Sequence, residues 1–160
     1  MYKARVITIS DRCYSNLRAD EAGPAVRKIL KEYSYEVSEV VVVPDEINII
    51  VNELEKAVDD NINLVVTTGG TGFSKRDVTP EATKLVIERE AQGISEYMRF
   101  KSMELTPHGM LSRGVSGIKC NTLIINLPGS PKAASENLMF VINSLEHGLK
   151  MLLTEQNDCA

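Results

Sequence analysis

The sequence predicts an α/β fold: a three-layer, doubly wound, mostly parallel sheet with helices on both faces. Strand-like and helix-like segments alternate along the 160 residues. The strand-like segments are near-continuous runs of valine, isoleucine and leucine, which is typical of parallel strands covered on both faces. No repeat, low-complexity segment or linker interrupts the alternation. We therefore expect a single domain over residues 1–160.

The first elements follow directly from the N-terminus. Residues 4–10 (ARVITIS) are β-branched and apolar and predict a strand. Residues 22–33 predict a helix, in which Pro24 suits the first turn. Residues 35–44 (YEVSEVVVVP) predict a second strand, which its final proline ends.

The middle of the chain continues the alternation. Residues 45–60 place their apolar side chains on one helical stripe, with Asp45 as a candidate N-cap. Residues 62–68 (INLVVTT) predict the third strand. Residues 79–90 predict a helix with Thr79 at the cap position and a proline in the first turn.

The last third repeats the same pattern after an irregular stretch. Residues 93–105 are expected to be helical, and residues 106–117 are the least regular part of the chain. Residues 119–128 predict a further strand. Residues 130–153 predict a long helix that opens with Ser130 as its cap, followed by a proline.

Composition and charge exclude several classes of function. Apolar residues make up 43% of the chain and charged residues 25%, as in ordinary globular proteins. No apolar run approaches the ~20 residues of a membrane span, and the N-terminal stretch lacks the features of a signal peptide. The net charge of -4 argues against nucleic-acid binding. We expect a cytoplasmic protein with no nucleic-acid and no membrane partner.

Cysteine and histidine form no pattern typical of a metal site or a catalytic triad. Cys13, Cys120 and Cys159 are widely separated and odd in number, so we expect reduced, mostly structural thiols. Cys120 falls within a predicted strand, which predicts burial. His108 and His147 have no sequence neighbours that suggest a triad.

Polar and glycine-rich residues follow each predicted strand. In open α/β sheets ligands bind beyond the carboxyl ends of the strands, so these residues should share one rim. The rim would collect Ser10, Asp11 and Arg12, then Pro44, Asp45 and Glu46, then Gly69 to Gly72 with Arg76 and Asp77, and finally Leu127 to Lys132.

Three glycines stand where the third strand ends, at Gly69, Gly70 and Gly72. Glycine tolerates positive φ and lets backbone amides approach a ligand, so this path from strand to helix suits a phosphate. Thr68 and Thr71 could add hydroxyl donors. A tight turn that needs flexible backbone is the alternative. Neither the P-loop pattern nor the dinucleotide fingerprint fits, because serine and lysine occupy positions 74 and 75, where a glycine would be needed.

Aspartates stand at three of the strand ends. Taken singly, Asp45 and Asp77 would cap or brace a helix. Together with Asp11 they could carry Mg²⁺, which prefers one or two carboxylates plus phosphate oxygens. Ser130 and Lys132 are equally ambiguous, as a helix cap with a neighbouring charge or as an anion seat at a helix N-terminus. The residue pattern alone leaves both alternatives open.

Residues 67–83 (TTGGTGFSKRDVTPEAT) closely resemble the signature of the molybdopterin adenylyltransferases. These are the MogA/MoaB-type molybdenum cofactor biosynthesis proteins, which are also similar to the G domain of gephyrin. The signature reads TxGGTG, three variable positions and RDxTPEA, and every fixed position is met. Residues 8–12 (TISDR), 44–46 (PDE) and 126–133 (NLPGSPKA) resemble the other landmarks, so the resemblance covers nearly the whole chain. Competence-damage-type and molybdate-inserting domains, which read GGLGPT with DD and GG with VS, fit less well.

The resemblance implies a reaction of molybdopterin with Mg-ATP that gives adenylylated molybdopterin and pyrophosphate. Asp45 and Asp77 match the family's essential aspartates and would serve the metal and the nucleotide. The expected substrate-binding residues are Ser10, Asp11, Thr68, Gly69, Gly70, Thr71, Gly72, Arg76, Pro128, Gly129, Ser130 and Lys132. The glycine-rich residues would hold phosphate through their amides, and residues 128–130 would hold the pterin side. No general base is expected, because the phosphate nucleophile is already ionised.

Two other functions remain as alternatives. A non-catalytic molybdopterin-binding or carrier paralogue would keep the pocket, although both aspartates are intact. A scaffolding role fits least, because no linker is present. The resemblance further implies a homotrimer or a hexamer and transfer of the product to a molybdate-inserting partner. Met98, Phe100 and Met110 are candidates for either the subunit interface or the core.

Overall fold

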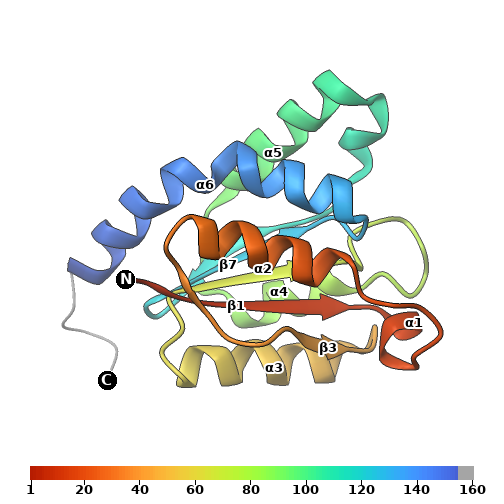
Figure 1. The fold of residues 1–160 in the computed structure, drawn as a ribbon, viewed down its shortest axis with the longest axis horizontal. Helices are drawn as coiled ribbons and strands as arrows, with labels where there is room; N and C mark the ends of the chain where they lie inside the picture. Colours follow the sequence, from red (N-terminus) through yellow and green to blue (C-terminus); the bar gives the residue numbers. More distant parts are fainter. Residues whose placement is uncertain (155–160) are drawn as a thin grey trace.

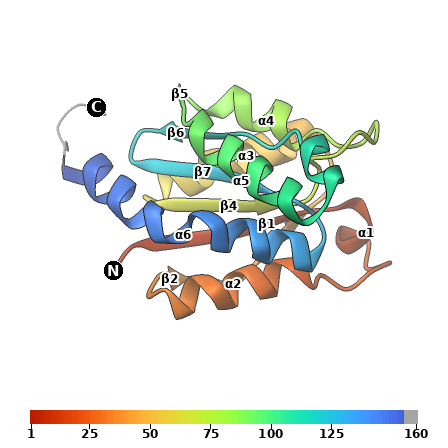
Figure 2. The same ribbon diagram turned by 90° about the horizontal axis from the view of Figure 1, so that it is seen from above.

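A computed structural model of the chain describes residues 1–154 and contains one sheet between two layers of helices (Figures 1 and 2). The elements in chain order are β1 (Lys3–Ile9), α1 (Asp11–Tyr14), α2 (Ala22–Glu32), β2 (Glu36–Val37), β3 (Val41–Val43), α3 (Ile47–Asp59), β4 (Leu64–Thr68), α4 (Thr79–Val86), β5 (Arg89–Glu90), α5 (Gln92–Leu105), the 3-10 helix η1 (Pro107–Leu111), β6 (Ser116–Lys119), β7 (Thr122–Leu127) and α6 (Pro131–Thr154). The predicted α/β class is confirmed.

The sheet has seven strands, six of them in the order β2-β1-β4-β7-β6-β5. The seventh, β3, pairs with the last residues of β1, along the edge whose first residues pair with β2. β1 is parallel to β2, β3 and β4, and β4 is parallel to β7, whereas β5, β6 and β7 pair antiparallel. The sheet is therefore mostly parallel, as predicted, with an antiparallel edge that the sequence did not predict.

Helices cover both faces of the sheet, and each face has its own core. Helices α2, α5 and α6 lie on one face, and α3 and α4 lie on the other (Figures 1 and 2). The first core joins apolar residues of α2 and α6 to alternate residues of β1, β4 and β7, and the second joins α3 and α4 to the other residues of the same strands. Central strands buried on both faces explain why β4 (LVVTT) has no exposed residue.

The strand register brings the loops that follow β1, β3, β4 and β7 to the same level. Thr8 pairs with Thr68, and Thr68 pairs with Leu127. On the other side of β1, Ile9 pairs with Val43. The parallel strands therefore end together, and the segments after them begin at one edge of the sheet.

The strand predicted over residues 35–44 is divided into two, and the single-strand prediction is wrong. Glu36 pairs with Lys3, 33 positions away, whereas Val41 pairs with Ile7, 34 positions away. The register against β1 thus changes by one residue between the two short strands. That extra residue interrupts the pairing, in the manner of a bulge.

Two further element predictions are corrected near the antiparallel edge. The helix predicted over residues 79–90 ends at Val86, because the backbone turns extended at Ile87 and β5 pairs with β6. Cys120 was predicted within a buried strand, but it lies in the turn between β6 and β7 with φ 49° and is only partly buried. Cys159 lies outside the described residues.

Among residues 1–154, no helix has both the length and the apolar character needed to cross a membrane.

Candidate active site

The segments that follow β1, β3, β4 and β7 meet around a cavity of about 260 Å³. The backbone pairing continues to its floor, where Ser10 N donates to Val43 O at 3.0 Å and Gly69 N donates to Leu127 O at 3.1 Å. The predicted residues that line this cavity are Ser10, Asp45, Thr68, Gly69, Gly70, Asp77, Gly129 and Ser130. The parallel register thus gathers residues up to 120 positions apart in the chain.

The glycine-rich loop requires glycine at its first two positions. Gly69 and Gly70 have φ values of 92° and 68°, in the left-handed region. A Cβ atom on Gly69 would lie 2.3 Å from the carbonyl oxygen of Ile9, and one on Gly70 would lie 2.2 Å from Thr79 Oγ1. The loop is therefore bent tightly over the end of β1 and against the start of α4.

The loop carbonyls are held by protein donors, and several of its amides are not used. Thr79 Oγ1 donates to Gly69 O at 2.9 Å, and Thr79 N donates to Gly70 O at 3.1 Å. Within residues 1–154, the amides of Gly70, Thr71 and Gly72 donate no hydrogen bond. Backbone amides that donate no hydrogen bond, next to glycines with positive φ, are typical of an anion-binding site.

Asp45 is joined to Asp11 by a reciprocal pair of backbone contacts. Asp11 N donates to Asp45 Oδ2 at 2.8 Å, and Asp45 N donates to Asp11 Oδ1 at 3.0 Å. Asp45 was predicted to cap the helix that follows, and this prediction is wrong, because α3 begins at Ile47 and Glu46 holds the cap position without a side-chain bond. The carboxylate of Asp45 instead faces the cavity. Burial and the nearby carboxylates raise its pKa, although the backbone hydrogen bond from Asp11 opposes this shift.

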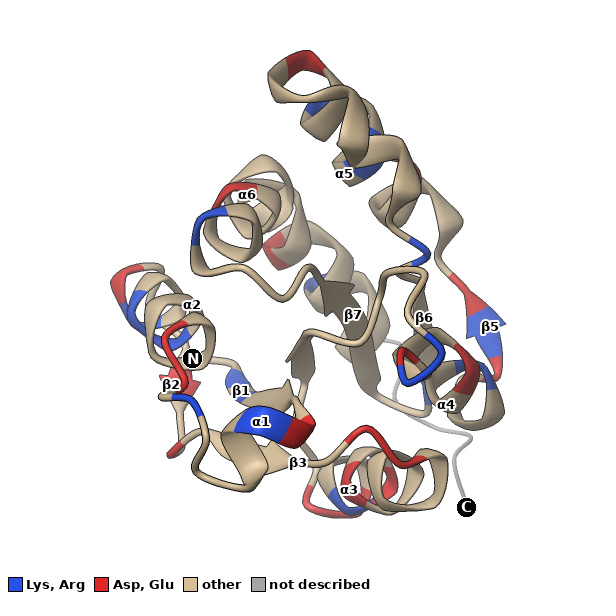
Figure 3. Cartoon of the chain, turned by 90° about the vertical axis from the view of Figure 1, so that its right-hand side faces the viewer, with Lys and Arg blue, Asp and Glu red and all other residues tan. Residues whose placement is uncertain are grey.

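Arg76 links the start of α1 to the start of α3. Its guanidinium contacts Asp11 through Nε at 2.9 Å and Nη2 at 3.1 Å, and it contacts Glu46 through Nη2 at 2.7 Å. The hydrogen bond from Arg76 lowers the pKa of Asp11. In the view onto the strand ends, the charged residues of α1 lie beside the acidic turn that leads into α3 (Figure 3). The side chain of Arg76 is therefore exposed, whereas that of its neighbour Asp77 lines the cavity.

One oxygen of Asp77 accepts a hydrogen bond from its own loop. Ser74 N donates to Asp77 Oδ2 at 3.1 Å, and a Cβ on Gly72 would lie 2.9 Å from the same oxygen. The other oxygen, Oδ1, receives no hydrogen bond from the described residues, and the same is true of Asp45 Oδ1. Thr79, predicted at the cap position of the next helix, is its first residue, with Val78 at the cap.

A second, larger cavity of about 580 Å³ lies on the other side of the loop. It is lined by Thr71, Gly72 and Pro128 among the predicted residues, and by the ends of α5, η1 and α6. Gly70, Asp77 and Gly129 line both cavities. The glycine-rich loop and the carboxylate of Asp77 thus border both cavities.

The remaining predicted residues have defined places. Ser10 caps α1 through Cys13 N at 3.2 Å, and Ser130 caps α6 through Ala133 N at 3.1 Å, as its predicted capping role requires. Arg76 and Lys132 are exposed and line neither cavity. His108 is exposed at the larger cavity and His147 is exposed on α6.

Thr8 and Asp20 are among the residues of the smaller cavity that the sequence did not predict. Thr8 Oγ1 donates to Asp20 Oδ2 at 2.7 Å, and Thr68 Oγ1 contacts Thr8 Oγ1 at 3.3 Å. Asp20 Oδ1 also accepts from Gly23 N at 3.0 Å, an amide of the first turn of α2, whose cap position is Glu21. The available signal for this residue was an aspartate just before a predicted helix, in residues 20–24 (DEAGP).

The carboxylates suit a magnesium ion that arrives with its substrate. In the described part of the chain, no group of three or more His, Cys, Asp or Glu side chains forms a ready metal site. Mg²⁺ commonly takes one or two carboxylates and completes its shell with phosphate oxygens and water. Two carboxylates at one cavity, each with one oxygen free of protein donors, fit that requirement.

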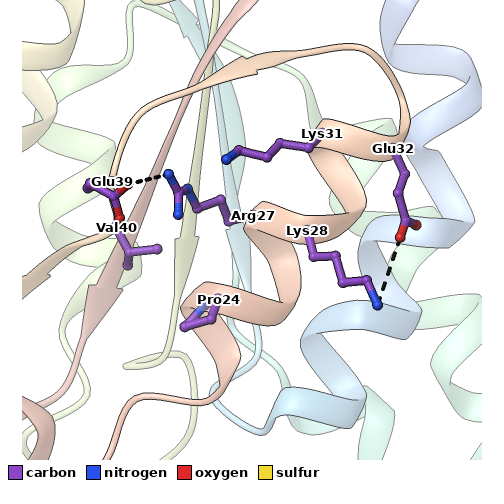
Figure 4. A pocket seen from close by; sticks show the side chains of 7 residues that line it. All are labelled: Pro24, Arg27, Lys28, Lys31, Glu32, Glu39 and Val40. Atoms are coloured by element: carbon purple, nitrogen blue, oxygen red, sulfur yellow. Dashed lines mark hydrogen bonds and ion pairs between the residues drawn. The ribbon is translucent and has the colours of Figure 1, made fainter.

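A further cavity of about 530 Å³ lies between α2 and the segment before β3, away from the strand ends (Figure 4). Two of its three cations are paired, since Arg27 contacts Glu39 at 2.5 Å and Lys28 contacts Glu32 at 4.0 Å, and only Lys31 forms no ion pair with a described residue. This groove therefore offers no concentrated charge for a ligand, despite its size.

Comparisons with known proteins agree on one family. Residues 5–147 match the MoCF_biosynth family, described as "Probable molybdopterin binding domain". The molybdenum cofactor synthesis protein cinnamon of Drosophila melanogaster is 42% identical over 150 residues, which cover 92% of this chain and 25% of cinnamon. The chain therefore spans about a quarter of that relative's length.

Smaller relatives match over most of their own length. The molybdopterin adenylyltransferase of Helicobacter pylori strain J99 is 40% identical over 151 residues, covering 92% of this chain and 86% of that enzyme. The crystal structure of the molybdopterin biosynthesis enzyme MoaB of Thermus thermophilus superposes with a TM-score of 0.92 at 40% identity, covering 97% of this chain and 98% of that chain. The chain belongs to the MoCF_biosynth family of molybdopterin-binding domains.

Proposed function

We propose that this protein is a molybdopterin adenylyltransferase, which transfers the AMP group of ATP to the phosphate of molybdopterin and releases pyrophosphate. The observation that carries the proposal is the glycine-rich loop with Asp77, which stands between two cavities and lines both. Relatives named for this reaction match at about 40% identity along 92% of the chain. A reaction between two phosphate-bearing substrates requires two binding spaces that meet at one anion-binding point.

This reaction depends mainly on positioning the two substrates and on neutralising the charge of their phosphates. The pterin phosphate oxygen forms a bond to the α-phosphorus of ATP, and the bond from that phosphorus to the bridging oxygen of pyrophosphate breaks. The nucleophile is ionised at neutral pH, so no proton has to be removed. Holding two polyanions in line replaces a bimolecular encounter and supplies much of the rate enhancement.

The site residues divide these tasks. The amides of Gly70, Thr71 and Gly72 would bind the phosphates, with the hydroxyl of Thr71 beside them. Pro128, Gly129 and Ser130 would hold the pterin side. These residues approach the loop closely, since a Cβ on Gly129 would lie 3.3 Å from the Cα of Gly69.

Asp45 and Asp77 would hold Mg²⁺ through their free oxygens. When bound, the ion would offset the negative charge that accumulates on the phosphates. Asp11 and Arg76 would act at the rim by fixing Asp45, and Lys132 would add positive charge near the start of α6. Thr68 and Gly69 would shape the cavity floor.

We also propose an assembly and a cellular setting. Large apolar side chains are exposed on α5 and η1, including Tyr97, Phe100, Leu105 and Met110, with exposures of 48% to 60%. Several large apolar side chains exposed on two neighbouring elements are typical of a subunit interface, which fits a homotrimer or a hexamer. Met98 is buried and belongs to the core. We propose a cytoplasmic enzyme, active as one domain over residues 1–160, that passes its product to a molybdate-inserting partner.

Isotope transfer tests the proposal. The purified protein is mixed with molybdopterin, Mg²⁺ and ATP that carries ³²P at either the α or the γ position. The α label should appear on the pterin, and the γ label should leave as pyrophosphate. Tight molybdopterin binding with neither label displaced would show a non-catalytic pterin-binding protein instead.

A further inference from the structure

The irregular stretch after η1 supplies one side chain that binds the glycine-rich loop. Arg113 Nε donates to Gly72 O at 2.7 Å, and Arg113 Nη2 donates to Asp77 O at 2.7 Å. The backbone N–H of the same residue donates to Thr71 O at 2.9 Å. Its remaining nitrogen, Nη1, pairs with Glu81 on α4. One residue thus binds three carbonyls of the loop and the helix that follows it.

These contacts determine which way the loop amides point. In a trans peptide the carbonyl and the next N–H point in opposite directions. The Thr71 and Gly72 carbonyls are turned onto Arg113, so the N–H groups of Gly72 and Phe73 are turned away from it. Thr79 fixes the first half of the loop in the same way. It donates hydrogen bonds to the carbonyls of Gly69 and Gly70, so the N–H groups of Gly70 and Thr71 point away from Thr79.

The segment that carries Arg113 is itself fixed on both sides. Arg99 on α5 donates through Nη1 to Gly114 O at 2.7 Å. Val115 N donates to the buried Asn126 Oδ1 at 3.1 Å, and Asn126 N donates to Val115 O at 3.0 Å. Arg113 is therefore anchored to α5 and β7 before it reaches the loop.

We propose that Arg113 is the positioning residue of the phosphate-binding loop: it holds the carbonyls of Thr71, Gly72 and Asp77 away from the cavities and so presents the loop amides to the substrate phosphates. Asp77 depends on it as well, because its main chain is held by Nη2. Arg113 lines neither cavity and acts only through the loop. This inference rests on the proposed function, in which the loop binds phosphate.

The planar fork of arginine is essential to this role. Two of its nitrogens reach two different carbonyls, while the third pairs with a carboxylate. Lysine carries a single ammonium on a flexible stem and cannot make the three contacts in one fixed geometry. Substitution by lysine keeps the charge and the attraction to Glu81 but loses the arrangement.

The experiment compares Arg113→Lys with two controls, Glu81→Gln and Arg27→Lys. Glu81→Gln removes the ion pair and leaves the carbonyl contacts, and Arg27→Lys makes the same exchange on α2, far from the loop. Mg-ATP binding is measured by calorimetry, turnover by pyrophosphate release, and folding by urea unfolding. Turnover of Arg113→Lys should fall about 100-fold, as when a preorganised donor is lost, and the Mg-ATP dissociation constant should rise about 10-fold. Both controls should stay within about 3-fold of wild type.

Binding and turnover separate the two claims. If the wild type binds Mg-ATP and turns over while Arg113→Lys matches it in both, Arg113 is not a positioning residue and the proposed function stands. If Arg113→Lys loses stability but each folded molecule keeps wild-type turnover, the role is structural and the inference is overturned. A wild type that binds no Mg-ATP would overturn the proposed function and the inference together.

Discussion

The carboxylate of Asp45 has an environment that a helix cap would not require. Its carboxylate accepts from Asp11 N at 2.8 Å, and its other oxygen lies beside the glycine-rich loop, 3.2 Å from where a Cβ on Gly70 would be. A half-buried carboxylate with one free oxygen, next to unused amides, is a costly arrangement for folding. Such a group is expected where it binds something.

The aspartates should therefore be needed for turnover but not for folding. We expect Asp45→Asn and Asp77→Asn each to lower turnover at least about 100-fold, because each removes a charge that would hold the metal. The free energy of unfolding should change by less than about 1 kcal/mol, because neither residue belongs to the apolar cores. Pyrophosphate release and urea unfolding measure the two effects. Unfolded variants would show that the aspartates act as structural braces.

The raised pKa of Asp45 predicts a pH dependence of stability. Its folded-state pKa lies above the ordinary value of 3.8, so ionising this carboxylate costs folding free energy. The cost is absent below the unfolded pKa and is fully present above the folded pKa. The unfolding free energy of Asp45→Asn minus that of the wild type should therefore rise with pH through this window and then level off. Urea titrations at several pH values test this, and a difference that falls with pH would contradict it.

At the scale of elements, the tight bend after β4 depends on glycine. Gly69 combines a φ of 92° with a Cβ position only 2.3 Å from the backbone oxygen of Ile9, which cannot move without disturbing β1. Gly148 is the contrasting case, because it lies in α6 with open space around its Cβ position. The two positions form a matched pair for the same substitution.

Gly69→Ala should lower the free energy of unfolding by at least about 2 kcal/mol, from strained backbone and a steric clash. Gly148→Ala should raise it by about 0.5 to 1 kcal/mol, because alanine favours a helix over glycine. Thermal and urea unfolding of both variants give the comparison. Equal stability of the two variants would mean that the loop is not bent as described.

Asn126 connects the elements behind the loop. Its Nδ2 donates to Thr67 Oγ1 at 3.1 Å and to Thr83 Oγ1 at 3.0 Å, and it also holds Val115 as described above. Asn126→Ala should cost about 2 kcal/mol or more, because buried polar groups lose their partner. Asn52→Ala, on the exposed side of α3, should change stability by less than about 0.5 kcal/mol. Urea unfolding measures both, and a similar effect at the two sites would contradict the connecting role of Asn126.

The position of the site was predictable because it follows from local sequence and a simple rule. Runs of valine and isoleucine predict parallel strands, and parallel strands end together, so Asp45, Gly69 and Gly129 had to meet. The antiparallel edge was not predictable in this way. The backbone turns at Ile87 because Glu88 N donates to Ile118 O at 2.8 Å, and that partner lies 30 residues further along the chain. Arg113 was missed for the same reason, since its partners lie in a loop about 40 residues earlier.

At the scale of the whole molecule, the apolar surface of α5 and η1 predicts self-association. Phe100 is 58% exposed on α5, and a charge at this position would be buried without a partner in an assembly. We expect Phe100→Glu to convert the proposed trimer to monomers in light scattering. Ile49→Glu, an exposed position on α3 at the opposite face of the sheet (Figure 1), should leave the mass unchanged. Wild-type protein that is monomeric at high concentration would contradict the assembly.

The most direct measurement of the central claim is pyrophosphate release under single omissions. The complete mixture of protein, molybdopterin, Mg²⁺ and ATP should release one pyrophosphate for each AMP–pterin adduct, and omission of either the pterin or the metal should abolish release. This result would establish that the two cavities serve one transfer reaction. Pyrophosphate release that continues without molybdopterin, or molybdopterin bound tightly with no pyrophosphate formed, would contradict it.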